Sequence, residues 1–305
     1  MATHAPPASP GARFIDPKVL ARVGSLELAA RFVVEGFING LHKAPYLGVS
    51  IDFAEHRGYM PGDDIRRVDW RLFARTDRFY VKQFEADTNT NFSVIFDVSK
   101  SMSFGSHELT KLDYGRFLAA CLSYLSSKQR DRVGIVTFDD DIVERVPPSA
   151  KHFEVSLHTL DRMVAGRPGA LGPPLYKATE FFKRPSIVAI ISDFYEEPEE
   201  VFDAVKPLRF AGNDVIMFHV LDPAEVDFPY DDSVSFQDIE TGRKVPVVPD
   251  KLRDQYRQLV RDHIEALTKL ANQNRIDYHF MNTKVPLDHA LFRYLAMRHK
   301  LTKGR

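Results

Sequence analysis

Two short apolar runs, each followed by an aspartate, constrain the fold of this chain more than any other feature. The first run, Phe92–Phe96, leads into Asp97, and the second, Ile187–Ile191, leads into Ser192 and Asp193. Both runs are short and contain β-branched residues, which is typical of strands buried on both faces of a parallel sheet. Open α/β sheets bind ligands beside the carboxyl ends of such strands, so we expect the functional site there.

From residue 91 onward, strand and helix patterns alternate along the chain. Strands are predicted near residues 93–97, 133–138, 142–146, 187–192, 214–220 and 276–281. Helices are predicted near 111–128, 151–164, 174–183, 198–209, 250–273 and 287–300. This alternation predicts an α/β fold with a doubly wound, mainly parallel sheet. A hairpin pattern interrupts the alternation in the segment 222–249, which we interpret as an insertion.

Three regions are expected before this domain. Residues 1–15 contain Ala, Pro and Ser, have no apolar h-region and are predicted to be disordered. Residues 16–45 have helical spacing of apolar side chains and predict an N-terminal helix. Residues 46–91 alternate short apolar pieces with turn signals, which indicates a small β-rich module. The main domain then covers residues 92–303.

The composition limits which classes of function and which partners we expect. The 305 residues include 41 Lys and Arg against 42 Asp and Glu, so net charge gives no reason to expect a nucleic-acid or membrane partner. No run is long and apolar enough to span a bilayer. The one cysteine, Cys121, excludes an internal disulfide and fits a reducing compartment, so we expect a cytoplasmic protein. The arginines at 66–78 leave a nucleic-acid patch as a third hypothesis, although acidic residues interleave with them.

The two strand-end aspartates suggest a cation site. If the strands are neighbours in the sheet, their ends lie about 5 Å apart. Two carboxylates so close need a proton, a basic side chain such as Lys100, or a shared metal. Ser99 and Ser101 follow Asp97 on the same loop and offer hydroxyl oxygens. Oxygen donors of this kind suit Mg²⁺.

This pattern resembles the metal-ion-dependent adhesion site of von Willebrand factor A-type domains. Asp97, Ser99 and Ser101 match its Asp-x-Ser-x-Ser loop, and Asp193 matches the aspartate of its third loop. The second loop departs from the pattern. Its expected Gly-Thr falls at Gly172-Pro173, and proline offers no hydroxyl. The resemblance implies a degenerate site for Mg²⁺ that an acidic side chain of a partner protein completes. We expect the partner to contact Lys100, Ser192 and Pro173.

A second resemblance concerns the residues before the main domain. The matching residues are Gly58-Tyr59-Met60-Pro61-Gly62-Asp63-Asp64, Arg66, Asp69-Trp70, Ala74-Arg75 and Val81-Lys82. They are similar to the signature of a bacterial family of unknown function, numbered 58, over residues 35–303. The resemblance implies a β-rich lead-in, a von Willebrand A-like domain and an association with MoxR-type AAA+ ATPases. We expect Asp63, Asp64, Arg66, Asp69, Trp70 and Arg75 to form a structural network that holds the module to the main domain.

Two hypotheses on function follow. The first is a non-enzymatic interaction module that acts as an adaptor for a MoxR-type ATPase or binds another protein through an acidic side chain. The alternative is a Mg²⁺-dependent phosphate-ester hydrolase that uses the same carboxylates. The sequence pattern offers no general base for this hydrolysis. A phosphatase with Asp97 as its nucleophile is also disfavoured, because such enzymes carry a second aspartate two residues on as general acid, where this chain has Ser99.

Overall fold

The computed structural model describes residues 25–43, 56–59, 70–82, 90–231, 234–239 and 242–303. The segment 1–15 lies outside these ranges, as do residues 16–24 of the predicted N-terminal helix and parts of the predicted module 46–91. None of the described helices is both long and apolar enough to cross a membrane.

Six strands form the central sheet. They are β3 (Asn91–Asp97), β4 (Arg132–Phe138), β5 (Ile142–Ser149), β6 (Ser186–Ser192), β7 (Asp214–Leu221) and β10 (Asp277–Asn282). Their order is β10-β7-β6-β3-β4-β5, and all neighbours are parallel except β4 and β5. The chain runs outward from β3 to β4 and β5, then returns to β6 on the other side of β3. This reversal between β3 and β6 is the topological switch point, where ligands of such sheets bind.

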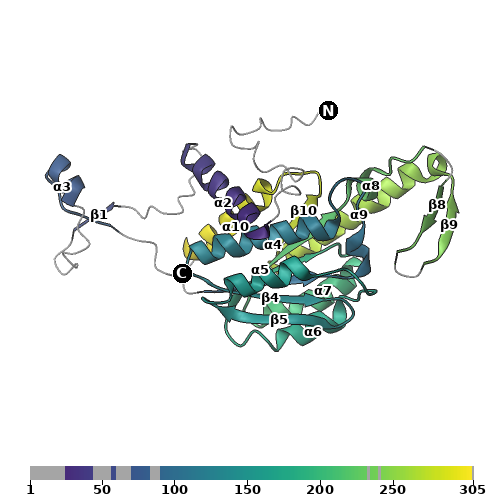
Figure 1. Cartoon of the computed structure of the whole chain (residues 1–305), viewed down its shortest axis with the longest axis horizontal. Helices are drawn as coiled ribbons and strands as arrows, with labels where there is room; N and C mark the ends of the chain where they lie inside the picture. The colour runs from purple at the N-terminus through teal and green to yellow at the C-terminus, as the bar shows by residue number, and fades with distance from the viewer. Residues whose placement is uncertain are drawn as a thin grey trace.

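Helices cover both faces of the sheet (Figure 1). One face carries α2 (Leu26–Lys43), α4 (Lys111–Lys128), α5 (Phe153–Arg162) and α10 (Asp288–Lys303). The other carries α6 (Gly172–Thr179), α7 (Pro198–Phe210) and α9 (Pro249–Asn274). The prediction of an α/β, doubly wound, mainly parallel sheet is therefore confirmed.

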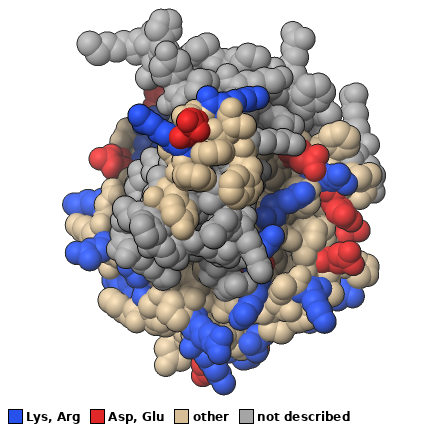
Figure 2. Space-filling model, turned by 90° about the vertical axis from the view of Figure 1, so that its left-hand side faces the viewer, with Lys and Arg blue, Asp and Glu red and all other residues tan. Residues whose placement is uncertain are grey.

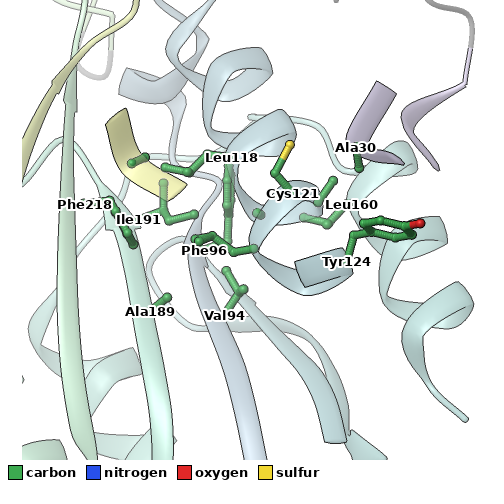
Figure 3. Close-up of a cluster of buried hydrophobic side chains, with 14 of the residues drawn as sticks. Ala30, Val94, Phe96, Leu118, Cys121, Tyr124, Leu160, Ala189, Ile191 and Phe218 are labelled. Carbon is green, nitrogen blue, oxygen red and sulfur yellow. The ribbon is translucent and has the colours of Figure 1, made fainter. Parts of the chain in front are cut away.

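The strand β3 shows why its apolar run is continuous. Val94 and Phe96 face the cluster formed with α4, whereas Ile95 faces the cluster formed with α6 and α7. Figure 3 shows Val94 and Phe96 beneath Leu118 and Cys121 of α4. Cys121 is fully buried, and burial raises the pKa of its thiol. A strand that is buried on both faces carries a continuous apolar run, because neither face needs polar side chains toward solvent.

Two local features fix α4 over the sheet. Thr110 and Asp113 form a reciprocal capping box that begins the helix. Gly115 then allows a close approach, since a Cβ there would lie 2.8 Å from the Phe96 ring and 3.2 Å from Ile191. These features bring the first turn of α4 to the ends of β3 and β6.

The N-terminal helix belongs to the main domain. Its described part, α2, buries Ala29, Ala30, Val33 and Val34 in the same cluster as α4 and α10. Figure 3 shows Ala30 beside the helices that carry Cys121 and Leu160. The spacing of apolar residues thus predicted the helix, but the sequence did not show that its apolar face completes the main core.

The predicted β-rich module contains a helix as well as strands. β1 (His56–Gly58) pairs antiparallel with β2 (Tyr80–Lys82), and α3 (Trp70–Thr76) lies between them in the chain. Trp70 packs edge-on against Phe73 and Phe79, yet is 55% exposed. Arg75 is exposed on α3. Asp63, Asp64, Arg66 and Asp69 lie outside the described residues, so the proposed structural network stays a prediction.

The insertion between β7 and α9 has the predicted hairpin. β8 (Val234–Gln237) pairs antiparallel with β9 (Lys244–Val247). A short helix, α8 (Pro223–Asp227), precedes the hairpin and was not predicted. Figure 1 shows α8, the hairpin and α9 together at one end of the sheet. This is the end at which β3, β6 and β7 terminate.

Candidate functional site: a cavity at the strand ends

The switch point brings the two predicted aspartates to one place. β3 and β6 run side by side, with Phe96 opposite Ile191, so Asp97 lies next to Ser192. The Ser192 hydroxyl donates a 2.6 Å hydrogen bond to Oδ2 of Asp97. Asp97 and Asp193 are both buried and both line the same cavity. The predicted juxtaposition of two strand ends is therefore observed.

The loop after β3 brings its two serines to the same cavity. The backbone N–H of Ser99 donates to Oδ1 of Asp97 at 2.8 Å, which closes a tight turn. The hydroxyls of Ser99 and Ser101 lie 3.0 Å apart. Ser101 belongs to the single-turn 3₁₀ helix η4 (Lys100–Ser103). Three of the four predicted metal ligands thus come from one loop.

The segment that faces this loop is Gly169 and Ala170. The backbone N–H of Lys100 donates to the carbonyl of Arg167 at 2.7 Å, which joins the two segments. A Cβ on Gly169 would lie 2.4 Å from Cβ of Ser99, so only glycine fits this approach. Pro173 is exposed in the first turn of α6 and is not among the residues that line the cavity. Its predicted partner contact stays a prediction.

The basic group at the site is Lys111, which the sequence analysis did not single out. Its ammonium donates to Oδ2 of Asp193 at 2.8 Å, to Oε1 of Glu225 at 2.8 Å and to the hydroxyl of Tyr195 at 3.3 Å. It also lies 4.5 Å from the centre of the Tyr195 ring. The side chain of Lys111 is fully buried. The sequence analysis had named Lys100 as a candidate cation, but it is Lys111 that reaches Asp193.

A signal for Lys111 was present in the sequence. It is the first residue of α4, directly after the capping residue Thr110. A lysine is unfavourable at this end of a helix because the helix dipole is positive there. Such a lysine indicates a compensating carboxylate elsewhere in the fold.

Burial and the charges of neighbouring groups together determine the pKa values of these side chains. Burial lowers the pKa of Lys111, but Asp193 and Glu225 outweigh it, so the pKa is raised and the ammonium is charged. Burial raises the pKa of Glu225, against the opposing effect of Lys111. Burial and the neighbouring Asp193 raise the pKa of Asp97 to about 7, although Ser192 and Ser99 oppose this. The groups that donate to the carboxylate of Asp97, the Ser99 N–H and the Ser192 hydroxyl, are neutral.

A third strand-end aspartate connects the insertion to the site. Asp222 follows β7 and forms a capping box with Glu225 at the start of α8. The carboxylate of Asp222 also accepts hydrogen bonds from the backbone N–H of Ser106 at 2.9 Å and from its hydroxyl at 2.5 Å. The sequence analysis missed Asp222 and Glu225, although the apolar run before Asp222 resembles the other two strand ends.

The turn after β6 has strained backbone. Phe194 has a φ of +42°, an uncommon value for a residue with a side chain. Its ring is fully buried in the core, whereas the residues on either side, Asp193 and Tyr195, both line the cavity. Its carbonyl accepts a 2.9 Å hydrogen bond from the ring of His263 on α9. The left-handed turn therefore directs both neighbours of Phe194 to the cavity while Phe194 itself enters the core.

The cavity above these residues has a volume of about 800 Å³. Its floor is polar and includes Asp97, Ser99, Ser101, Lys111, Asp193 and Glu225. Its wall comes from the insertion and α9 and includes Phe228, Tyr230, Phe236, Leu252, Tyr256 and Leu259. The sequence left open whether segment 222–249 contacts the site. The structure shows that it forms one wall.

The donor set fits a resident ammonium better than a resident Mg²⁺. In the adhesion-type arrangement both aspartates serve the metal, but here Lys111 holds Asp193. The segment facing Ser99 supplies Gly169 and Ala170, which have no hydroxyl. Among the described residues, no group of three or more His, Cys, Asp or Glu has the geometry to hold a metal ion. A divalent ion would have to displace Lys111 or to rely on Asp97 and the two serines.

Comparison with known proteins assigns the family. The family model described as "Protein of unknown function DUF58" matches residues 55–266. The chain belongs to this family. An uncharacterised protein of Mycobacterium tuberculosis is 32% identical over 258 residues, which are 81% of this chain and 80% of that protein. Its description assigns no function.

Two solved structures are similar to this DUF58 chain. BatB from Bacteroides thetaiotaomicron is 16% identical, with a TM-score of 0.49 over 69% of this chain and 99% of BatB. The von Willebrand A domain of SpRpn10 is 11% identical, with a TM-score of 0.38 over 68% of this chain and 93% of that domain. The DUF58 chain itself has a mainly parallel six-stranded α/β domain with the Asp-x-Ser-x-Ser loop at its switch point.

Proposed function

We propose that this DUF58 chain is a non-enzymatic interaction module that receives a segment of a partner protein in the cavity at the strand ends. The observation that carries the proposal is the form of the cavity. A polar floor is joined to an apolar wall, and the wall continues to exposed apolar side chains at its rim. Tyr195, Leu252 and Leu259 line the cavity and are 51%, 41% and 60% exposed. Exposed apolar residues grouped beside a cleft are typical of protein-binding sites.

The partner class we propose is a MoxR-type AAA+ ATPase, for which the chain would act as an adaptor. This part rests on the family resemblance. We propose that the ATPase contacts the cavity floor that carries Asp97, Ser99, Ser101 and Asp193, the residues of the predicted adhesion-type site. An acidic side chain of the partner could bind this floor only through an added cation such as Mg²⁺, since the floor is itself acidic.

Hydrolysis of a phosphate ester has less support. The carboxylate of Asp193, which that reaction needs for Mg²⁺, is already paired with Lys111 at 2.8 Å. Glu225 is paired with the same ammonium. A polar floor held by internal ion pairs suits recognition better than metal-assisted attack on phosphate.

Photo-crosslinking in intact cells tests the proposal. Leu259, at the rim of the cavity, is replaced by the photoreactive residue benzoylphenylalanine, and captured proteins are identified by mass spectrometry. Phe210 is the matched control, because it is 82% exposed at the end of α7 and does not line the cavity. We expect an AAA+ ATPase from position 259 and none from position 210.

Capture of the same proteins from both positions would contradict the proposal, as would recovery of no partner from position 259. Capture at position 259 of a protein that is not an ATPase would keep the interaction module and remove the MoxR-type partner.

A further inference from the structure

We propose that the cavity selects a basic side chain, lysine or arginine, carried by a partner segment with apolar residues on either side of it. This inference rests on the proposed function, in which the cavity receives a partner segment, and it specifies the chemistry of that segment. It differs from the adhesion-type expectation, in which the partner contributes an acidic side chain through a metal ion.

The charge of the floor is the first argument. Among the described residues that line the cavity, five carry carboxylates and only Lys111 carries a positive charge. The three N–H donors of Lys111 are matched by three acceptors, on Asp193, Glu225 and Tyr195. An incoming carboxylate would therefore compete for an ammonium that is already saturated.

Asp97 is the group that an incoming cation would meet. Its two oxygens accept hydrogen bonds from neutral donors, the backbone N–H of Ser99 and the hydroxyl of Ser192. No ion pair to Asp97 is found among the described residues. Because only neutral groups contact this carboxylate and Lys111 is engaged elsewhere, the floor is short of positive charge. A cationic side chain would relieve this deficit, whereas a carboxylate would increase it.

The wall is suited to the stem and the charge of a basic side chain. Phe228 contacts Tyr256 and Phe236, with ring centres 4.6 Å and 5.4 Å apart, and Tyr230 meets Phe236 edge-on at 4.9 Å. Aromatic faces attract cations, and the methylene stem of a lysine or arginine packs on such surfaces.

Lys111 shows that this environment stabilises an ammonium. Its Nζ lies over the Tyr195 ring and between two carboxylates, in a fully buried position. A second basic side chain would find the same combination, with Asp97 as its carboxylate and the insertion as its aromatic surface. The apolar rim then accounts for apolar neighbours in the partner segment.

Binding of three labelled peptides to the full chain tests this inference. The peptides have the same leucine-rich sequence and differ at one central position, which is lysine, norleucine or glutamate. Norleucine keeps the stem of lysine without its charge. Fluorescence anisotropy is measured with a chelator, so that no divalent ion takes part. We expect the lysine peptide to bind about tenfold more tightly than the norleucine peptide and the glutamate peptide to bind most weakly.

Two variants test whether Asp97 is the residue that causes the preference for the lysine peptide. Asp97→Asn should reduce the preference for lysine over norleucine to about threefold or less, with norleucine binding unchanged. Asp203→Asn, at an exposed position of α7, removes one negative charge away from the cavity and should leave the preference intact. Circular dichroism confirms that both variants are folded.

Three outcomes would overturn the inference: equal binding of the lysine and norleucine peptides, no binding of the lysine peptide, or an equal effect of both variants. Tightest binding of the glutamate peptide after addition of Mg²⁺ would also overturn it, in favour of the adhesion-type site. Each of these outcomes leaves the crosslinking result from Leu259 untouched. A failed inference about the side chain is thereby separated from a failed proposal about the module.

Discussion

At the carboxyl ends of the strands the charged side chains are buried, whereas at the amino ends of the same sheet they are mostly exposed. The carboxyl end has the cavity of about 800 Å³, which is lined by the buried side chains of Lys111, Asp97 and Asp193. The amino end has a depression of about 370 Å³ bordered by Arg145, Lys183 and other basic residues. Figure 2 looks at this end and shows lysine and arginine side chains along the lower part of the face.

The two ends of the sheet differ in the partners that the fold must supply for their charged side chains. A buried charge needs partners, because its removal from water is costly and only paired charges offset that cost. An exposed charge keeps its water and needs none. At the carboxyl end, the starts of α4 and α8 and the ends of β3 and β6 supply the partners. At the amino end, Arg145 stacks on the Phe181 ring with 3.9 Å between guanidinium and ring centre, and both charge and stem stay near solvent.

Removal of the buried ammonium is the largest expected effect. Lys111→Met keeps the stem but leaves Asp193 and Glu225 without their cation. We expect the free energy of unfolding to fall by about 3–5 kcal/mol, as for other broken buried ion pairs. Urea unfolding followed by circular dichroism measures the change.

A matched surface lysine provides the control for this variant. Lys177 pairs with Asp141 at 2.8 Å, but its side chain is 53% exposed. Lys177→Met should therefore change the free energy of unfolding by less than about 1 kcal/mol. If Lys111→Met lowered the free energy of unfolding as little as Lys177→Met, burial would not make the charges at the carboxyl end more important for stability. The double variant Lys111→Met/Asp193→Asn should recover part of the lost stability, because one unpaired carboxylate is removed.

The close approach of two loops gives the next largest effect. Gly169→Ala would place a methyl group 2.4 Å from Cβ of Ser99, so the loop after β3 must move. We expect a loss of about 1–3 kcal/mol, the usual cost of overpacking, together with weaker binding of the lysine peptide. Gly166→Ala is the control on the same segment, since a Cβ there meets nothing within 4 Å. Equal stability of both variants would show that the loop after β3 is free to shift.

The sequence predicted the parts of the site that depend on local pattern. The apolar runs before Asp97 and Asp193 end at the predicted positions because strands buried on both faces cannot continue into polar residues. The bounds of α4 agree with the predicted 111–128, since Thr110 and Asp113 cap its start. Both aspartates, Ser99 and Ser101 line the cavity for this reason.

The sequence did not predict the parts that depend on long-range contacts. Lys111 meets Asp193 and Glu225 across 82 and 114 residues of chain, and no local spacing encodes such a pairing. The segment facing Ser99 was placed at Gly172-Pro173, whereas the close approach occurs at Gly169, where only the absence of a Cβ reveals it. A loop's position depends on the elements that flank it, and those are set by the whole sheet.

The titration of Asp97 gives a smaller, pH-dependent effect. Its pKa is raised from the ordinary 3.8 to about 7 by burial and Asp193, so between these values the unfolded chain loses a proton that the folded chain retains. Stability from this group is fully present below about pH 4 and is lost as pH rises to about 7. Asp97→Asn removes this pH-dependent loss of stability, because asparagine does not ionise. We expect the variant to exceed the wild type by about 1–3 kcal/mol at pH 8 and to match it near pH 4.

Thermal and urea unfolding at several pH values between 4 and 8 check the sign of the Asp97 effect. A stability difference that is constant with pH would mean that Asp97 is ionised in the folded chain throughout this range. In that case a cation must already balance it, and the shortage of positive charge on the floor would be contradicted.

The smallest effect is expected at the amino end. Arg145→Leu removes an exposed guanidinium from the Phe181 ring and keeps an apolar side chain on it. Exposed cation–π contacts contribute about 0.5–1 kcal/mol, and the leucine retains part of the packing, so the loss should stay below about 1 kcal/mol. Urea unfolding and binding of the lysine peptide are measured together, and the peptide should bind as to the wild type. A loss comparable to that of Lys111→Met would show that the amino end also depends on its charges. Weaker peptide binding would show that the two ends are coupled through the sheet.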